Sequence, residues 1–332
     1  MADRPVTDPD VDPLVREMET TLIGGRPRYT RDEVDAQAGM ASEPARALWQ
    51  ALGFAAVDDD VPAFTDADVA ALTAVRELAA ELALDDAQLR AMARTLGRTF
   101  ARLAAWQGDL LVEVLTQRPE LIKPGEDLPT FLDRTLDTLQ GLQNYVWRRQ
   151  LAAYVSRITA APAADASGTT MAVAFVDMAQ FTALTRRVSE ETLRSVLDEF
   201  DSLTTDVIGA HRGQVVKTIG DEVLFVADDA RAAADIALGL VEAAADSDVL
   251  PPLRAGVASG PVVSRLGDVF GQTVNIASRL TTHARAGTVL VDENAASVLD
   301  SIDGYVLRPL RPTSVRGYHH LRAWRLSRSG AA

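Results

Sequence analysis

Two aspartates in the second half of the chain stand where predicted strands end, a position from which carboxylates can hold a cation. Asp177 directly follows the apolar run 173–176, which predicts a buried strand. Asp221 lies in a Gly-Asp turn between predicted strands at 214–219 and 222–226. If these strands are neighbours, both carboxylates project from one sheet edge. Two oxygen ligands with open positions suit Mg²⁺ or Mn²⁺.

The backbone just after Asp177 offers a second possible binding feature at the same edge of the sheet. A helix is predicted to start there, so the amides of residues 178–182 form a candidate anion site. Two metal ions held beside them would deprotonate a hydroxyl and neutralise a leaving pyrophosphate. Each feature taken singly has an ordinary alternative, because an aspartate after a strand often caps a helix and Gly-Asp is often only a turn.

A lysine and an aspartate further along pair one hydrogen-bond donor with one acceptor. Lys217 is one of only two lysines among 33 basic residues, and Asp268 stands in the run GDVFG. An ammonium can donate to purine N1 and a carboxylate can accept from an exocyclic amino group. Together they match the edge of adenine, whereas guanine offers a carbonyl and a protonated N1. An exposed strand lysine is the alternative interpretation.

Asn275 and Arg279 are four residues apart in a segment, 274–283, that is predicted to be helical. They therefore share one face of that helix. An amide and a guanidinium there would orient a ribose and stabilise charge on a phosphoryl group. A merely polar helix surface is the alternative.

These residues lie in four segments whose sequence, order and spacing resemble the catalytic domain of class III nucleotidyl cyclases. The segments read AVAFVDMAQFT (172–182), VVKTIGDEVLF (215–225), RAGVASGPVV (254–263) and GDVFGQTVNIASRL (267–280). The similarity covers about residues 170–326. Any one motif alone would be weak, and the combination is specific.

The resemblance implies an adenylyl cyclase that converts ATP to 3′,5′-cyclic AMP and pyrophosphate by in-line attack of the ribose 3′ oxygen on the α-phosphorus. It implies two Mg²⁺ or Mn²⁺ ions per active site, held by Asp177 and Asp221 with Met178 beside them. It also implies a homodimer with active sites at the interface. The metal aspartates would come from one chain, and Lys217, Asp268, Asn275 and Arg279 would come from the other. The remaining residues implied are the catalytic Asn275 and Arg279, and Phe181, Thr182 and Arg316 in substrate binding, where Arg316 replaces a family lysine that binds phosphate.

The elements around these residues predict an α+β fold with helices on one face of a mixed sheet. Strands are expected at 253–259 and 262–266, separated by Gly260-Pro261. The resemblance identifies this part as a ferredoxin-like class III cyclase catalytic domain preceded by an all-α regulatory domain. We expect a disordered tail (1–13), a helical regulatory domain (14–158), a linker (159–170) and the catalytic domain (171–328).

The helical half carries a capping box at Thr30 and Glu33, and apolar stripes along 85–106 and 129–158 that are typical of a bundle core. Residues 29–72 resemble the helix-turn-helix of MerR-type regulators. Residues 1–165 hold 17 basic against 27 acidic residues, a net charge of −10. A DNA reader needs a basic face, so nucleic acid is not an expected partner.

Composition excludes several classes of protein. The chain has no cysteine, which excludes disulfides and thiol catalysis, and its net charge is −14. No apolar run reaches the length of about 18 residues that a membrane span needs. The residues at 1–5 are not typical of a secretory signal. We therefore expect a cytoplasmic protein.

In layout the chain resembles actinobacterial class III cyclases whose helical N-terminal half inhibits the catalytic half. In that subgroup pH relieves the inhibition and the helical half accommodates lipids, so the expected effectors are a proton or a lipid. All four histidines follow residue 210, so an imidazole sensor would lie in the catalytic half. The alternatives are a catalytically weak nucleotide-binding sensor and a DNA-binding regulator with a cyclase-like domain.

Overall fold

The computed structural model describes residues 13–122, 125–160, 169–311, 313–315 and 318–330. The chain divides into two compact units, Met1–Ala160 and Ala161–Ala332. The predicted tail lies outside the described residues except for Pro13, which begins α1. Of the predicted linker, residues 161–168 lie outside them as well.

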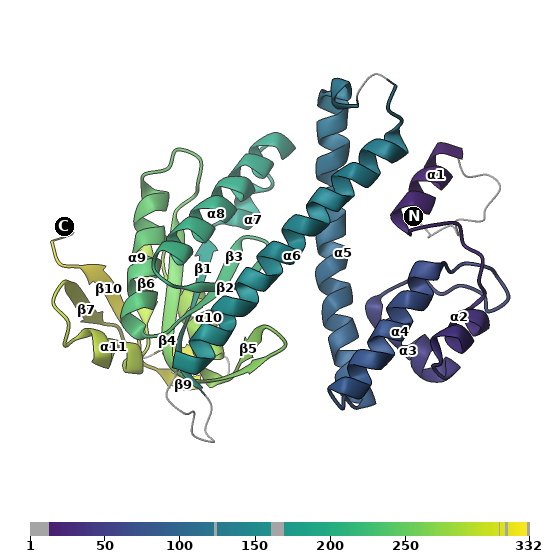
Figure 1. The fold of residues 1–332 in the computed structure, drawn as a ribbon. Helices are drawn as coiled ribbons and strands as arrows, with labels where there is room; N and C mark the ends of the chain where they lie inside the picture. Colours follow the sequence, from purple (N-terminus) through teal and green to yellow (C-terminus); the bar gives the residue numbers. More distant parts are fainter. Residues whose placement is uncertain (1–12, 123–124, 161–168, 312, 316–317, 331–332) are drawn as a thin grey trace. The chain divides into compact units, whose positions relative to one another are not determined.

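The regular elements of the first unit are helical, as expected (Figure 1). Its helices are α1 (Pro13–Leu22), α2 (Arg31–Ala38), α3 (Ser42–Leu52), α4 (Asp66–Glu81), α5 (Asp86–Gln117), a 3₁₀ turn (Pro119–Leu121) and α6 (Leu128–Ala160). The capping box that opens α2 is confirmed. The Thr30 amide donates to Glu33 Oε2 at 2.8 Å, and the Glu33 amide donates back to the Thr30 hydroxyl at 3.4 Å. An isolated β-bridge joins Tyr29 to Phe64 before α4.

The prediction that the apolar stripes of α5 and α6 form a bundle core is wrong for most of their length. Buried side chains of this unit gather around α2, α3, α4 and the first turns of α5, where Ala93 is 2% exposed. Beyond that point Phe100 is 52% and Trp106 is 59% exposed, and Trp147 of α6 is 61% exposed. Periodicity marks the apolar face of a helix correctly, but it does not supply a partner helix for that face.

The second unit is built on a mixed sheet with strand order β2-β3-β1-β4-β6-β10-β7, in which β5 pairs with β4. The segment β1-α8-β2-β3-α9-β4 and the order β2-β3-β1-β4 give the ferredoxin-like arrangement that was expected. The bounds are β1 (Thr169–Met178), α7 (Phe181–Leu184), α8 (Glu190–Ala210), β2 (Gln214–Ile219), β3 (Glu222–Ala227), α9 (Ala230–Ala245), β4 (Leu253–Arg265), β5 (Asp268–Phe270), α10 (Gln272–His283), β6 (Thr288–Val291), α11 (Glu293–Leu299), β7 (Tyr305–Pro309), β8 (Thr313–Val315), β9 (Tyr318–Leu321) and β10 (Trp324–Arg328).

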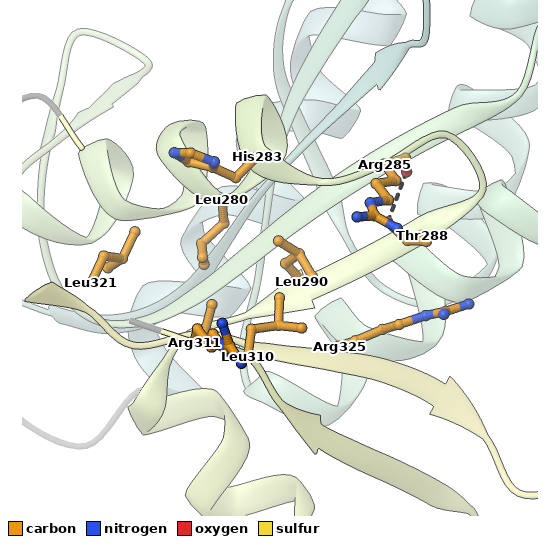
Figure 2. A pocket seen from close by; sticks show the side chains of 10 residues that line it. Leu280, His283, Arg285, Thr288, Leu290, Leu310, Arg311, Leu321 and Arg325 are labelled. Atoms are coloured by element: carbon orange, nitrogen blue, oxygen red, sulfur yellow. Dashed lines mark hydrogen bonds between the residues drawn. The ribbon is translucent and has the colours of Figure 1, made fainter. Parts of the chain in front are cut away.

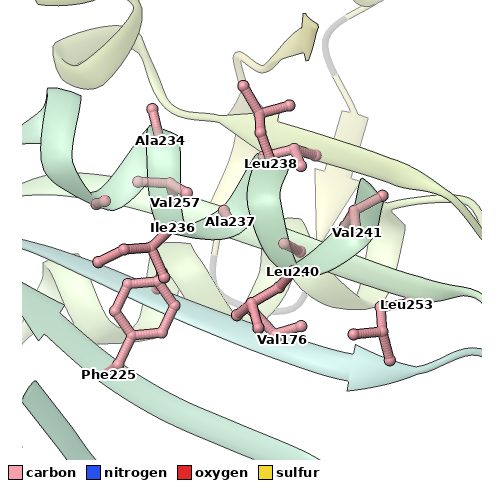
Figure 3. Close-up of a cluster of buried hydrophobic side chains, with 14 of the residues drawn as sticks. Val176, Phe225, Ala234, Ile236, Ala237, Leu238, Leu240, Val241, Leu253 and Val257 are labelled. Carbon is pink, nitrogen blue, oxygen red and sulfur yellow. The ribbon is translucent and has the colours of Figure 1, made fainter. Parts of the chain in front are cut away.

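Helices cover both faces of this sheet, so the prediction of a single covered face is wrong. The larger core joins α8, α9 and α11 to one face, and Figure 3 shows Ile236 and Leu240 of α9 against Phe225 and Val176. The opposite face of β1, β3 and β4 packs against α10 in a second cluster that includes Phe175. Burial on both faces explains why β1 reads as a continuous apolar run rather than an alternating one.

β4 runs without a break from Leu253 to Arg265, which corrects the expected interruption at Gly260-Pro261. Its first part pairs with β1 and its last residues pair with β5. The Thr273 hydroxyl donates to the Pro261 carbonyl at 2.8 Å, so α10 binds the strand where its sequence is least strand-like.

Gly256 lets α10 approach β4 closely. A Cβ added at Gly256 would lie 2.3 Å from the Thr281 amide nitrogen and 2.5 Å from the Ala277 carbonyl oxygen. Any side chain there would therefore push the helix away. Over the described part of the chain, each helix lacks the combination of length and apolar character that crossing a membrane requires.

Candidate active site

The strand end of β1 and the β2–β3 turn bring the two predicted metal aspartates to one edge of the sheet. Asp177 is paired in register with Glu222, the residue after Asp221. The Met178 amide donates to the Asp221 carbonyl at 3.1 Å, which fixes the turn against the end of β1. The neighbourhood expected from the sequence is therefore present in a single chain.

Arg254 of β4 completes this edge on the other side of β1. It lies opposite Asp177 in the β1–β4 register, and its Nε donates to Asp177 Oδ2 at 2.8 Å. Its Nη2 donates to the same oxygen, and its Nη1 reaches the Thr282 carbonyl at 3.3 Å. One guanidinium thus ties the Asp177 carboxylate to the end of α10.

Crowded negative charge perturbs this edge. Burial raises the pKa of Asp221, and the nearby Asp177 carboxylate raises it further. Burial, followed by repulsion from Asp177 and Asp221, raises the pKa of Glu222 to about 7. Arg254 offsets part of the repulsion at both groups. These carboxylates repel one another and a single arginine offsets only part of that repulsion. A bound divalent cation would therefore stabilise this edge.

The donor set at this edge fits Mg²⁺ or Mn²⁺ bound together with substrate. The described residues contain no cluster of three or more Asp, Glu, His or Cys side chains arranged as a complete metal cage. Mg²⁺ usually takes one or two protein carboxylates and obtains its other ligands from water and substrate phosphates. Asp177 and Asp221 match that pattern.

The anion site predicted at the amides of 178–182 is smaller than expected. The Met178 amide donates to Asp221, and the Ala179 amide donates to the Pro252 carbonyl at 2.9 Å. Both are therefore unavailable to a phosphate, and the helix that follows, α7, has only four residues. Phe181 and Thr182 lie at its start.

Lys217 and Asp268 form an ion pair between β2 and β5. Lys217 Nζ lies 2.5 Å from Asp268 Oδ2, and Asp268 Oδ1 accepts from the Val269 amide at 2.8 Å. The pairing of β2 with β3 skips Val216, and such a bulge re-aims the next side chain. Both side chains remain partly exposed, at 37% and 29%. The donor and acceptor predicted to read a purine are thus adjacent and accessible.

Asn275 and Arg279 are on α10, as expected, one turn apart. Asn275 is exposed and Arg279 is partly exposed. The helix beneath them is held to the sheet by the Thr281 hydroxyl, which donates to the Phe175 carbonyl at 3.2 Å. Arg316, the predicted phosphate ligand near the C-terminus, lies outside the described residues.

Four of the predicted residues form two groups within one chain, Asp177 with Asp221 and Lys217 with Asp268. Among the described residues, no hydrogen bond or ion pair links the Asp177–Asp221–Arg254 group to the Lys217–Asp268 pair. Sequence reasoning missed Arg254 and Glu222. An arginine in a strand is unremarkable in sequence, and only the register with Asp177 gives it a place at this edge.

Comparison with known proteins agrees with this architecture. Residues 165–328 match the adenylate and guanylate cyclase catalytic domain. A protein named adenylate cyclase from Streptomyces coelicolor is 43% identical over 297 residues, covering 88% of this chain and 77% of that protein. Another of that name from Glutamicibacter nicotianae is 36% identical over 330 residues, covering 94% of this chain and 82% of that protein.

Solved structures of cyclase domains are also similar. The catalytic core of a rhodopsin–guanylyl cyclase with converted specificity, in complex with ATPαS, is 25% identical with a TM-score of 0.46, covering 49% of this chain and 97% of that one. The sequence identity to these relatives, and the share of each chain that is matched, show which protein family this chain belongs to. The chain belongs to the adenylate and guanylate cyclase family.

Proposed function

We propose that this protein is an adenylate cyclase that converts ATP to 3′,5′-cyclic AMP and pyrophosphate. The observation that carries the choice of ATP is the Lys217–Asp268 pair, whose Nζ and Oδ2 are 2.5 Å apart. A lysine facing purine N1 and an aspartate facing the exocyclic group fit adenine, whose N1 accepts and whose amino group donates. Guanine presents a protonated N1 and a carbonyl at the same two positions. The relatives from Streptomyces and Glutamicibacter carry the name adenylate cyclase, which supports the same assignment.

The proposed roles follow from charge and position. Asp177 and Asp221 would hold two divalent ions, with Met178 beside them, and Arg254 orients the Asp177 carboxylate. Bound Mg²⁺ or Mn²⁺ would supply charge neutralisation and activation of the ribose 3′ hydroxyl. Asn275 orients the ribose, and Arg279 stabilises the charge that develops on the α-phosphoryl group. The further substrate contacts proposed are Phe181, Thr182 and Arg316.

We propose further that each active site forms between two copies of the chain. Within one chain the metal group and the purine pair share no described hydrogen bond or ion pair, an arrangement compatible with two halves of a shared site. Most of the work is positioning of the ribose oxygen and the α-phosphorus, so small shifts of one copy against the other would control the rate.

The helical unit is the proposed source of such control. Its long helices expose apolar side chains, including Trp106 and Trp147, that need a covering partner. The match to the Streptomyces coelicolor relative extends over 88% of this chain, so both units belong to the shared architecture. We propose that this unit inhibits the catalytic unit and that a proton or a lipid relieves the inhibition.

Product analysis tests the activity directly. The full-length protein is incubated with Mn²⁺ and either ATP or GTP, and products are separated by liquid chromatography and identified by mass. We expect cyclic AMP from ATP and at most a trace of cyclic GMP. Absence of a cyclic product from either nucleotide would favour a nucleotide-binding sensor, and cyclic GMP as the main product would contradict the adenine assignment.

Regulation is tested by comparing full-length protein with residues 160–332 across about pH 5.5–8, a range that spans the ordinary imidazole pKa. Autoinhibition predicts that the short chain is more active at neutral pH and less dependent on pH. Equal specific activity of the two proteins at every pH, with and without lipid vesicles, would contradict the proposal.

A further inference from the structure

A pocket of about 330 Å³ lies in the catalytic unit at the C-terminal end of α10. It is bounded by β6 and by the segments that contain β7, β9 and β10. Figure 2 shows that its centre is surrounded by leucine side chains from separate segments, namely Leu280, Leu290, Leu310 and Leu321. The volume falls in the range of small-molecule sites, which is about 300–1,000 Å³.

Apart from Thr288, the polar side chains around these leucines are basic. His283, Arg285, Arg311 and Arg325 line the pocket, and its described lining contains no carboxylate. Arg285 and Arg325 form no ion pair with any residue that the structure describes. In a chain with a net charge of −14, this is a local reversal of sign beside an apolar surface.

We propose that this pocket binds a small organic anion with an apolar body and a carboxylate or phosphate monoester head. Leu310 and Leu321, which keep accessible surface over the buried Leu280 and Leu290, would cover the apolar body, and its removal from water would favour binding. The guanidinium groups of Arg285 and Arg325 would receive the head through charge-assisted hydrogen bonds. A neutral apolar molecule would make no use of these two exposed cations, and a bare inorganic anion would not cover the exposed part of Leu310.

The pocket is separate from the proposed nucleotide site but borders it. None of its lining residues belongs to the metal group or the purine pair. Thr288, which lines it, is the register partner of Arg254, and Arg254 donates to the carbonyl of Thr282, the residue before His283. A ligand there would contact the segments that hold the arginine of the metal edge.

Calorimetric titration of the full-length protein tests this binding without relying on cyclase activity. The probes are octanoate and octyl phosphate, with 1-octanol as the uncharged match and acetate as the headgroup alone. We expect saturable binding of octanoate, octyl phosphate or both, and at least tenfold weaker binding of 1-octanol and acetate, because both parts of the probe contribute. Equal binding of octanol and octanoate would overturn the proposal.

Substitutions locate the binding in the pocket. Arg285→Glu combined with Arg325→Glu removes the head contacts, and Leu310→Trp fills the apolar space from its partly exposed edge. We expect each to weaken the probe affinity at least tenfold. Arg194→Glu, a charge reversal on the exposed surface of α8, should leave it unchanged. Circular dichroism checks that each variant is folded, and unchanged affinity in both folded pocket variants would overturn the assignment.

Competition separates this pocket from the nucleotide site. Octanoate affinity is measured with and without saturating α,β-methylene-ATP and Mn²⁺. Binding of both ligands together is expected, with at most a modest change in affinity. Full competitive displacement would show that the probe occupies the nucleotide site. Because binding is the readout, a protein without cyclase activity could still pass this test.

Discussion

Lys217 Nζ lies 2.5 Å from Asp268 Oδ2 within a single chain. The donor and the acceptor that are proposed to read adenine therefore satisfy each other when no base is present. A base that binds must replace this contact with one bond to each partner. A purine with the wrong hydrogen-bonding pattern would break the Lys217–Asp268 contact without forming new bonds to either residue. Its binding would therefore be weakened more than by the loss of one contact alone.

Reversal of the lysine charge should remove the preference for ATP. In Lys217→Glu, two carboxylates face each other across β2 and β5, and neither can donate to adenine N1. We expect kcat/KM for ATP to fall at least tenfold while the fold is kept, because the site is partly exposed. The exposed variant Arg194→Glu is the control, and unchanged ATP kinetics in Lys217→Glu would remove the adenine role.

Loss of either metal aspartate should abolish turnover. Asp177→Asn or Asp221→Asn removes one of the charges proposed to hold the metal ions, at a cost of several kcal/mol in the transition state. We expect kcat to fall about a thousandfold or more. Circular dichroism should remain that of the wild type. A wild-type rate in either folded variant would refute the metal assignment.

Mixed dimers test whether a site is shared between chains. Asp177→Asn and Arg279→Ala each disable one half of every site, and a mixed dimer would contain one intact site. Random pairing at equal expression should restore about a quarter of wild-type activity, since half of the dimers are mixed and each has one working site of two. Two variants that stay inactive when they are expressed together, despite forming dimers, would contradict the shared site.

When Arg254 is removed, a divalent cation should be able to replace its positive charge beside Asp177. Arg254→Ala leaves the Asp177 carboxylate, whose side chain is only 13% exposed, without its counter-charge. A divalent ion could take over that role, so Mn²⁺ should raise the melting temperature of the variant more than that of the wild type. The double variant Arg254→Ala/Asp177→Asn should lose this extra response. An equal Mn²⁺ effect in all three proteins would separate Arg254 from the metal site.

Asp292 should make stability depend on pH. Burial raises its pKa from 3.8 to about 6, although its carboxylate caps α11 through the Ala295 amide. The native state therefore holds a proton more tightly than the unfolded chain, and this stabilisation is present below about pH 4 and lost as the pH rises past 6.

Asp292→Asn, which keeps the capping oxygen, should be more stable than the wild type by about 2–3 kcal/mol at pH 7 and nearly equal to it near pH 4. Urea unfolding of both proteins at several pH values measures the difference. A difference that does not change with pH would contradict the raised pKa.

The sequence was sufficient where local chemistry fixes the structure. Asp177 at a strand end, the Gly-Asp turn before Glu222 and the capping box at Thr30 all occur where the pattern predicted them. In each case the signal lies within a few residues, so the fold had little freedom to override it.

Features that depend on distant segments were missed or wrong. Arg254 belongs to the site only because β1 and β4 pair in one register. The predicted break at Gly260-Pro261 is absent because the pairing of β4 with β1 continues through both residues, which lie opposite Met171 and Thr170. The helix that carries Phe100 and Trp106 has an apolar face as predicted, yet both side chains are exposed in the described unit.

Gly256 has a consequence beyond packing. The helix that carries Asn275 and Arg279 packs directly against the strand backbone at Gly256. Gly256 has no side chain that could move aside under strain. Replacing one hydrogen by a methyl group at this point would lift both polar groups together, relative to the strand that carries Arg254. Mutation of this single position should therefore inactivate the protein without touching any group that meets the substrate.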